Sequence, residues 1–458
     1  MKLRRIETPE ISHFAYLIAD DGEAAIVDPR RDVEEYLSVA RDLGVRIRYV
    51  IETHRQEDFV MGSAHLAART GAEIVNGEHD LFGHGDRRLA DGDELCLGSL
   101  RIRALHTPGH TPESMSYAVY AGAGSDEAWG VFTGDALFFG DTGRTDLPDA
   151  DAARDNAALL YDMIHQKIAP LGDQALVLPA HGPGSVCGSG MAPLPSSTIG
   201  AERRYNVVFT CSRDEFAEKK GSERIPRPPY FRHMEKVNLD GGLPPAGHPD
   251  EVALLGVDEL AERIEGAYCI DTRQPEAFAG GHVERAYSIW LGGLPVFGGW
   301  IAEPDTPLYL VGDRDADIAT AFTHLSRIGI DGVRGALAGG FGSWRSSGRP
   351  LEFSGVITPR QLAERRDELP VLDVREPDEF ASGHIPGARN VYVGHLEDQL
   401  DQLSLDRDEP VAVTCGVGHR AGVAVSILRR AGFTDVRNLL GGMKAWSALD
   451  LSTEEGDR

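Results

Sequence analysis

Cys415 begins a short loop whose residue types suit sulfur chemistry. The segment CGVGHR, residues 415–420, follows the apolar stretch VAVT and precedes a helical pattern, so it is expected at a strand-to-helix turn. Loop N–H groups, the helix N-terminus and the Arg420 guanidinium would converge on the sulfur and favour its nucleophilic thiolate. Cys415 is therefore the expected nucleophile and Arg420 its cation. The residues expected to form the loop between them are Gly416, Val417, Gly418 and His419.

Taken alone, Cys415 could be a buried free thiol at the end of a strand. The loop, however, resembles that of the rhodanese sulfurtransferases, in which six residues from Cys to Arg cradle a cysteine persulfide. The upstream stretch DVREPDEFASGHIPGARN is similar to the other signature region of that family. Phosphatases of similar fold use a loop one residue longer, so the spacing favours sulfur over phosphate. The resemblance predicts a catalytic rhodanese domain over residues 356–455.

The same domain occurs twice in the chain. CIDTRQPEAFAGGHVERAYSI aligns with VLDVREPDEFASGHIPGARNV at a constant separation of 102 positions, as between Asp271 and Asp373. In the earlier copy Gly312 and Asp317 occupy the positions of the nucleophile and the arginine. That copy has neither a thiol nor a cation there, so we expect an inactive rhodanese-like domain over residues 252–350.

Strands and helices alternate before this repeat. FAYLIADDGEAAIVD predicts two strands joined at an Asp-Gly turn, and DVEEYLSVARDLG predicts a helix that ends at Gly44. RIRYVIETH is then a strand that delivers His54 to a loop, where open α/β sheets place ligand-binding groups. The stretch NLDGGLPPAGHPDE is expected to be a linker. The first domain is accordingly predicted over residues 1–240.

Four motifs in this first half resemble those of the metallo-β-lactamase superfamily, and more narrowly of its glyoxalase II and persulfide dioxygenase branches. They are ETHRQEDFVMGS, HTPGHTPES, VFTGDALFFGDTGRTD and LPAHG, in the family's order. The expected fold class is therefore α/β, with a metallo-β-lactamase αββα sandwich followed by two rhodanese-like α/β domains. The resemblance also implies a metal site whose ligands in this chain are His54, His110 and Asp135.

The first motif departs from the family pattern T-H-x-H-x-D-H. Gln56 and Phe59 replace two of its histidines, which removes ligands of a dinuclear zinc site and spares the implied triad. Two histidines and one carboxylate, with open positions opposite, form the ligand set of non-haem Fe(II) oxygenases. In the persulfide dioxygenases the iron ligands are the residues that match this triad. We therefore expect one Fe(II) per chain, with zinc as the alternative.

Further residues are expected beside the metal or at the substrate. In related hydrolases the residues that match Asp58 and His181 hold the second zinc. In this chain Asp58, His181 and Asp135 could form a second zinc site, with one ligand fewer than in those hydrolases. Arg144 in GRTD could pair with a substrate carboxylate or hold its loop through backbone carbonyls. Cys187 in GSVCG follows the His181 loop and could face the cavity, although a passive free thiol is expected.

Length and composition narrow the class of protein. The 458 residues exceed the size of a single hydrophobic core, which favours several domains. A net charge of −26 disfavours nucleic acid and membrane surfaces as partners, and no stretch is long and apolar enough to span a bilayer. Five widely spaced cysteines favour a reducing cytoplasm over a disulfide framework, and no signal-peptide core is expected at the N-terminus.

Together these features predict a persulfide dioxygenase coupled to a sulfurtransferase. The resemblance implies that a small-molecule thiol persulfide and O₂ react at Fe(II) to give sulfite and thiol, while Cys415 transfers sulfane sulfur. Glutathione and coenzyme A are both candidates for the thiol, sulfur could flow in either direction, and a homo-oligomer is compatible with the family. Two alternatives stay open. One is a glyoxalase II-like zinc hydrolase of thioesters with a fused rhodanese, and the other is a sulfurtransferase whose N-terminal half is not catalytic.

Overall fold

The computed structural model describes residues 1–122, 124, 127–147, 149–188 and 190–456. They form two compact units, Met1–Ala246 with Arg327–Gly329, and Gly247–Ser326 with Ile330–Arg458. Within these described ranges no helix is long and apolar enough to cross a membrane. All five cysteines are free.

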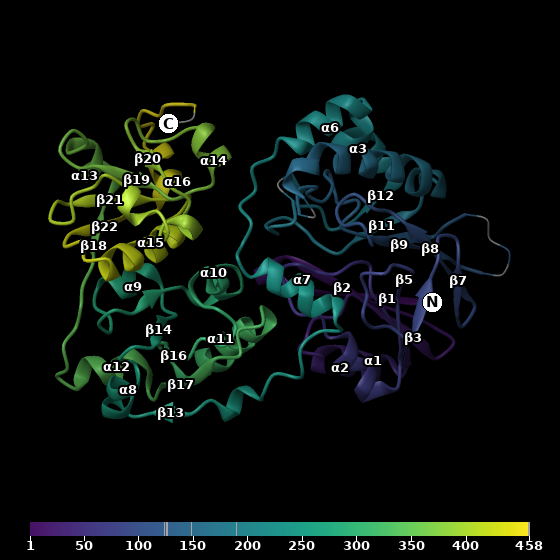
Figure 1. Ribbon diagram of the computed structural model, residues 1–458, viewed down its shortest axis with the longest axis horizontal. Coiled ribbons are helices and arrows are strands. Elements are labelled where there is room, and N and C mark those ends of the chain that lie inside the picture. Colours follow the sequence, from purple (N-terminus) through teal and green to yellow (C-terminus); the bar gives the residue numbers. More distant parts are fainter. Residues whose placement is uncertain (123, 125–126, 148, 189, 457–458) are drawn as a thin grey trace. The chain divides into compact units, whose positions relative to one another are not determined.

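Two six-stranded sheets form the first unit (Figure 1). Their strand orders are β1-β2-β3-β4-β5-β6 and β12-β11-β10-β9-β8-β7. The first sheet consists of β1 (Lys2–Thr8), β2 (His13–Asp20), β3 (Glu23–Val27), β4 (Arg46–Ile51), β5 (Glu73–Gly77) and β6 (Arg87–Leu89). The second consists of β7 (Glu94–Leu97), β8 (Leu100–His106), β9 (Met115–Tyr120), β10 (Gly130–Gly134), β11 (Leu176–Pro179) and β12 (Ser197–Thr198).

Successive residues of the central strands face different cores. In β2, Tyr16 and Ile18 belong to the cluster between the two sheets, whereas Leu17 packs with Tyr36 in a helix-covered cluster. A third cluster joins the second sheet to its own helices through residues such as Leu160. Both sheets are buried on both faces, so the unit is the predicted αββα sandwich. Its helices are α1 (Glu34–Leu43), α2 (Ser63–Thr70), α3 (Ala153–Met163), α4 (Ile199–Tyr205), α5 (Val207–Thr210), α6 (Arg213–Gly221) and α7 (Phe231–Leu239).

The strands and the helix predicted before His54 are present, whereas the start of the predicted linker near residue 240 differs from the structure. Helix α1 ends at Leu43, and Gly44 follows at φ 65, the left-handed C-cap that the sequence indicates. The expected linker starts too early, because Asn238 and Leu239 belong to α7. Asn238 is fully buried, which a linker residue would not be.

Two five-stranded parallel sheets form the second unit. Their orders, β13-β17-β16-β14-β15 and β18-β22-β21-β19-β20, are the same topology repeated. The first copy contains β13 (Leu254–Leu255), α8 (Val257–Arg263), β14 (Tyr268–Asp271), α9 (Pro275–Ala279), β15 (Tyr287–Ser288), α10 (Leu294–Ile301), β16 (Leu308–Val311), α11 (Asp315–Arg327), β17 (Val333–Leu337) and α12 (Gly340–Ser346). The second contains β18 (Gly355–Ile357), α13 (Pro359–Glu364), β19 (Val371–Asp373), α14 (Pro377–Ala381), β20 (Arg389–Asn390), β21 (Val411–Thr414), α15 (His419–Arg430), β22 (Val436–Leu439) and α16 (Gly442–Ser447).

The two copies also share their packing in detail. His282 stacks on Phe278 with ring centroids 3.6 Å apart, and His384 stacks on Phe380 at 3.7 Å. Each histidine also exchanges backbone hydrogen bonds with a glutamate late in its own copy. The internal repeat read from the sequence is confirmed.

A tight approach by Gly442 supports the loop that begins at Cys415. The Met443 N–H donates to the Cys415 carbonyl at 2.8 Å, and the Lys444 N–H donates to the Gly416 carbonyl at 3.0 Å. Gly442 has a φ of 54, and a Cβ placed on it would lie 2.2 Å from the Cys415 carbonyl oxygen. A residue without a side chain is therefore required there.

We predict that Gly442→Ala destabilises the second unit more than Gly387→Ala does. Gly387 has a φ of 76 and open space around its Cα, so its substitution costs only the left-handed backbone conformation. Gly442→Ala adds the clash with Cys415, worth roughly 1–3 kcal/mol. Calorimetric unfolding of both variants measures the difference, and equal unfolding temperatures would contradict the prediction.

Candidate metal centre and sulfur loop

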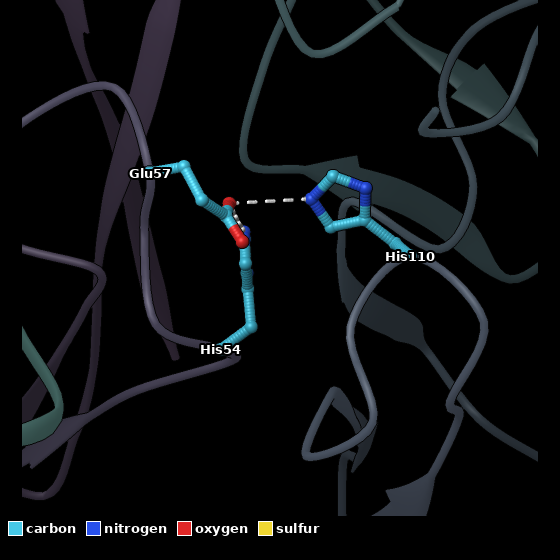
Figure 2. A group of neighbouring side chains, drawn as sticks. All are labelled: His54, Glu57 and His110. Carbon is cyan, nitrogen blue, oxygen red and sulfur yellow. Dashed lines mark ion pairs between the residues drawn. The ribbon is translucent and has the colours of Figure 1, made fainter. Parts of the chain in front are cut away.

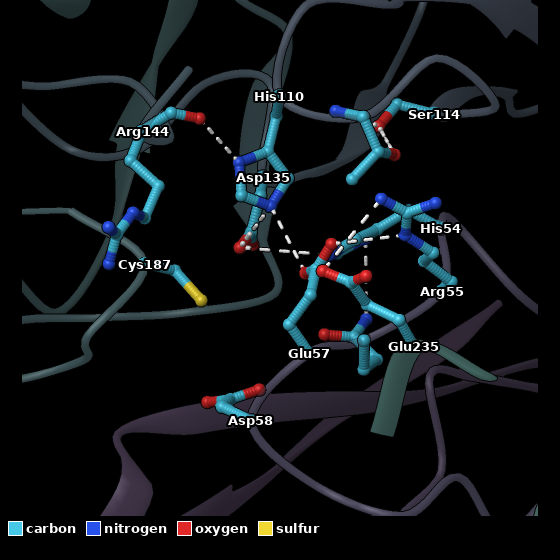
Figure 3. Close-up of polar contacts among 12 residues, drawn as sticks. His54, Arg55, Glu57, Asp58, His110, Ser114, Asp135, Arg144, Cys187 and Glu235 are labelled. Carbon is cyan, nitrogen blue, oxygen red and sulfur yellow. Dashed lines mark hydrogen bonds and ion pairs between the residues drawn. The ribbon is translucent and has the colours of Figure 1, made fainter. Parts of the chain in front are cut away.

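Four loops at one edge of the two sheets bring the predicted metal-binding residues together (Figure 3). His54 follows β4, His110 lies between β8 and β9, Asp135 follows β10 and His181 follows β11. All four side chains are buried. The loops come from both sheets, so the site depends on how the sandwich closes.

His54, His110 and Asp135 present donor atoms to a common point. The Asp135 Oδ2 lies 3.7 Å from His54 Nε2 and 3.5 Å from His110 Nε2. Neither Nε2 has a hydrogen-bond partner in the described part of the chain. Ligands about 2.0–2.2 Å from one ion lie about 2.8–3.6 Å from each other. The separation from His110 lies within this range and the 3.7 Å separation from His54 lies just above it, so a small approach of His54 would let the three predicted residues hold one metal ion.

Hydrogen bonds to the far side of each ring orient the two histidines. His110 Nδ1 lies 2.7 Å from the Arg144 carbonyl oxygen, so that nitrogen carries the proton and Nε2 keeps its lone pair. His54 Nδ1 lies 2.9 Å from the Thr53 Oγ1, and the Thr53 hydroxyl donates to the Asp28 carboxylate at 2.8 Å. The Thr53 oxygen therefore accepts from His54 Nδ1–H, and burial lowers the pKa of His54, which keeps its Nε2 free for a metal.

Asp28 is a positioning residue that the sequence analysis missed. Its backbone has a φ of 50, in the left-handed region that residues other than Gly rarely adopt. It also accepts the Thr53 N–H at 2.8 Å. Burial raises the pKa of Asp28 to about 7, against the opposing effect of the Thr53 hydrogen bonds. Only the position of Asp28 at the end of a predicted strand could have marked it.

His181 and Asp58 lie beside the triad. His181 Nδ1 is 2.8 Å from Asp135 Oδ1, and His181 Nε2 is 3.1 Å from Asp58 Oδ2. Although burial opposes a charge on the ring, the Asp135 and Asp58 carboxylates raise the pKa of His181 well above its usual value. His181 thus orients Asp135 and links it to Asp58.

The Cys187 thiol is buried beside the candidate metal ligands. Its Sγ and donor atoms of Asp58 and His181 lie within 4.8 Å of one another, and the same holds for Cys187, His110 and Asp135. Burial raises the pKa of Cys187 well above its usual value, which favours the neutral thiol. The sequence offered both positions, and the structure places the sulfur at the site.

Arg144 is fully engaged in holding its loop. Its guanidinium makes two hydrogen bonds of 2.7 Å to Asp146 and donates to the backbone carbonyls of Val186 at 3.1 Å and Ile225 at 2.7 Å. The side chain is 1% exposed. Of the two roles open from the sequence, these contacts favour loop support over binding a substrate carboxylate.

Glu57 is a second residue that the sequence analysis missed. Its side chain is fully buried, with Oε2 3.5 Å from His110 Nε2 and 3.8 Å from His54 Nε2 (Figure 2). Although burial favours the protonated carboxyl, the His110 and His54 imidazoles lower the pKa of Glu57 to about 2. An acid three residues after His54 was the available signal, but the family pattern assigns no role to that position.

The two departures from the family pattern are accommodated in the loop. The buried Asn238 amide donates to the Gln56 carbonyl at 2.6 Å and to the Phe59 carbonyl at 2.8 Å. Phe59 packs in a small apolar cluster with Ile11 and Met61. An aromatic ring thus occupies the position of one lost histidine, and α7 fixes the loop backbone.

The sulfur loop has part of the predicted arrangement. Several N–H groups were expected to converge on Cys415. Within this loop, all of whose residues are described, the Gly418 N–H alone donates to Cys415 Sγ, at 3.1 Å. The Arg420 guanidinium makes a two-pronged ion pair with Glu379, at 2.5 and 2.8 Å. Although burial opposes the charge, Glu379 raises the pKa of Arg420, which stays cationic beside the sulfur. The His419 ring stacks on Trp290, with centroids 4.6 Å apart.

The equivalent loop of the first copy is acidic. Arg314 pairs with Asp317 at 2.7 Å, and Asp315 accepts the Gly339 N–H at 3.0 Å. The Phe341 N–H donates to the Gly312 carbonyl at 2.8 Å, matching the bond between Met443 and Cys415 in the second copy. The backbone scaffold is kept, whereas the thiol and the cation are replaced.

Comparison with known protein families identifies the folds of the two units. The model of the metallo-beta-lactamase superfamily matches residues 8–181, and that of the rhodanese-like domain matches residues 256–347 and 358–449. These matches fall within the three domains predicted from the sequence.

Individual relatives cover from about half to about three quarters of this chain. A "Probable metallo-hydrolase" of Burkholderia pseudomallei is 32% identical over 290 residues, covering 54% of this chain and 96% of that protein. The human mitochondrial "Persulfide dioxygenase ETHE1" is 29% identical over 250 residues, covering 53% of this chain and 89% of that protein. The crystal structure of a metallo-beta-lactamase from Staphylococcus aureus is 30% identical with a TM-score of 0.66, covering 74% of this chain and 98% of that one.

We predict that Asp28→Asn lowers the metal content of the purified protein. The amide can donate to Thr53 Oγ1, which would reverse the hydrogen-bond chain and place the His54 proton on Nε2. A loss of roughly 10- to 100-fold in metal affinity is typical when such a supporting residue is changed. Asp21→Asn is the control, because Asp21 is exposed and has a similar φ of 48. Equal metal content in the two variants, measured by elemental analysis, would show that the Asp28 chain does not set the His54 tautomer.

Proposed function

The chain belongs to the metallo-beta-lactamase superfamily and carries two rhodanese-like domains, and from this premise we propose that it couples a persulfide dioxygenase to a sulfurtransferase. The substrate is a low-molecular-weight thiol persulfide, such as that of glutathione or coenzyme A, together with O₂. The name of the human relative supports the assignment of the first unit.

One observation carries the proposal. The unpartnered Nε2 atoms of His54 and His110 face one oxygen of Asp135, while Gln56 and Phe59 stand where a dinuclear zinc site needs histidines. Two imidazoles and a carboxylate with open positions form the usual ligand set for Fe(II) oxygenases. Fe(II) held there would supply the electron-transfer chemistry that activates O₂.

The residues around the triad prepare it for this chemistry. The Arg144 carbonyl and the Thr53 hydroxyl hold the His110 and His54 protons on Nδ1. His181 fixes the Asp135 carboxylate through both oxygens. Burial of all these groups excludes bulk water from the reacting sulfur.

The proposed net reaction balances. A persulfide RSSH, O₂ and water give the thiol RSH, sulfite and two protons. The sulfane sulfur is oxidised by four electrons, which reduce O₂, and the S–S bond breaks with the thiol as leaving group.

Cys415 would handle sulfane sulfur in the second unit. Its thiolate attacks the outer sulfur of a persulfide and displaces the thiol, and the resulting Cys415 persulfide passes its outer sulfur to sulfite. The product is thiosulfate, and the Cys415 thiolate is regenerated. Arg420 and the Gly418 N–H stabilise the anionic sulfur throughout. This chemistry requires a free thiol, and we therefore propose a reducing compartment such as the cytoplasm.

A zinc hydrolase of glyoxalase II type is the second candidate. It is favoured by the second group of donors, Asp58, His181 and Cys187, which could hold another ion. Such an enzyme would cleave a thioester with a metal-activated water and would not need O₂.

We predict that the Fe(II)-loaded protein consumes O₂ with glutathione persulfide, and that the sulfite and thiosulfate formed together equal the O₂ consumed. His110→Ala should lower this rate by at least about 100-fold, because a ligand is lost. His106→Ala is the matched control, since His106 lies in the same HTPGH motif and bonds the Pro112 carbonyl instead. Iron-loaded protein that consumes no O₂ with either glutathione or coenzyme A persulfide, but cleaves thioesters when zinc is bound, would replace the dioxygenase with the hydrolase.

Cys415→Ser should separate the two activities. We predict that this variant still consumes O₂ but accumulates sulfite and forms no thiosulfate, whereas Cys96→Ser, at an exposed cysteine, behaves like the unaltered protein. Sulfite and thiosulfate are measured by chromatography. If Cys415→Ser loses all turnover and His110→Ala loses none, the first unit is not catalytic and the chain is a sulfurtransferase.

A further inference from the structure

Glu57 turns one carboxylate oxygen toward the imidazoles of His54 and His110, and this oxygen makes ion-pair contacts with them but no hydrogen bond within the described residues. Its Oε1 lies 3.4 Å from the Arg55 Nε, whereas its Oε2 has no hydrogen-bond partner among the residues that the structure describes. The side chain is fully buried. Leaving a carboxylate oxygen unpaired in a protein interior is costly, so a cation is the natural partner of this atom.

The free oxygen is placed like that of the predicted ligand Asp135. Glu57 Oε2 lies 3.5 Å from His110 Nε2 and 3.8 Å from His54 Nε2. The corresponding distances from Asp135 Oδ2 are 3.5 and 3.7 Å. In Figure 2 the Glu57 carboxylate points between the two imidazoles, and its donor atom lies within 4.8 Å of both of theirs. The two carboxylates therefore approach the same pair of nitrogens with equivalent geometry.

We propose that Glu57 is a fourth protein ligand, bound to the metal through Oε2. It would join His54, His110 and Asp135 in a site of two imidazoles and two carboxylates. Gln56 stands where the family pattern has a histidine. The next residue, Glu57, would supply an anionic oxygen as a ligand instead of that histidine. This inference rests on the metal centre of the proposed function and adds a ligand to it.

Arg55 fixes which oxygen is available. Its guanidinium lies against Glu57 Oε1, and Glu113 and Glu235 approach the same guanidinium at 3.8 and 4.0 Å. The arginine thus neutralises one side of the Glu57 carboxylate and leaves the other side for the ion. Binding through a single oxygen follows from this division.

The added carboxylate has two chemical consequences. A six-coordinate ion with four protein ligands keeps two open positions, enough for one substrate sulfur and one further small molecule. An oxygen-rich donor set also suits Fe(II) and Mn(II) better than it suits metals that prefer sulfur ligands.

Metal binding by Glu57→Gln tests the proposal without turnover. Metal-free protein is titrated anaerobically with Fe(II) against a competing chelator, and the absorption spectrum of the Co(II)-loaded protein is recorded. We expect the dissociation constant for Fe(II) to rise by roughly 10- to 100-fold, as for other changes at metal sites, and the Co(II) bands to shift. Glu113→Gln is the matched control, because Glu113 is also buried, contacts Arg55 and has an oxygen without a partner in the described residues. It should bind both metals like the unaltered protein.

Glu57→Asp separates ligation from charge. It keeps the negative charge and shortens the side chain by one methylene, so direct ligation predicts weaker Fe(II) binding and an altered Co(II) spectrum here too. Unchanged affinity and spectrum in Glu57→Gln would overturn the proposal, and so would full retention of both by Glu57→Asp. If Glu57→Gln fails to fold, the Glu57→Asp result decides alone. Because the readout is binding, absence of dioxygenase activity would count against the proposed function and leave the ligand assignment standing.

Discussion

The first unit is organised around buried negative charge that needs a cation. Glu57, Asp58 and Asp135 are all buried within one group of loops, and Arg55 is the cationic side chain paired with the first of them. Ionised carboxylates in an interior are costly unless they are paired or bind a metal. Although burial opposes it, Asp135 raises the pKa of His181 and Glu57 raises the pKa of His110, so the carboxylates favour positive charge at this site. A metal would need the lone pair of His110 Nε2, so protonation of that nitrogen would compete with metal binding and couple metal affinity to pH.

The rest of the sandwich holds these charges in register. Asn238, from the last helix of the unit, bonds the backbone of the loop that carries His54. The Arg144 guanidinium bonds Asp146 within its own loop and connects that loop to the segments of Val186 and Ile225, while the Arg144 carbonyl accepts from His110. Asp28 has a left-handed backbone conformation, and its carboxylate accepts hydrogen bonds from the Thr53 N–H and hydroxyl. These bonds orient Thr53, which in turn orients His54. The supporting residues are as specific as the ligands, because each fixes a proton or a ring orientation.

The second unit shows how one scaffold serves two purposes. Both copies keep the same strand order and the stacked Phe-His pair. They also share a backbone hydrogen bond to the first residue of the loop, from Phe341 to Gly312 in the first copy and from Met443 to Cys415 in the second. Only the second copy combines a thiol with a cation, because Arg420 stands where the first copy has Asp317. The Arg420 guanidinium would stabilise an anionic sulfur carried by Cys415, whereas the Asp317 carboxylate would repel one. The two copies thus share their fold and differ in the loop residues that could carry chemistry.

The sequence by itself determined the α/β class, the repeat, the αββα unit and the motif residues His54, His110, Asp135 and Cys415. Local periodicity and motif spacing carry that information within short stretches of chain. Tertiary structure alone decided the roles of Glu57, Cys187 and Arg144 and brought Asp28 and Asn238 into the site. Each of these roles depends on contacts between segments far apart in the sequence: Asn238 meets Gln56 across 182 positions. The direction in which a buried side chain points is set by the packing of both sheets and their helices, and no spacing along the chain encodes it.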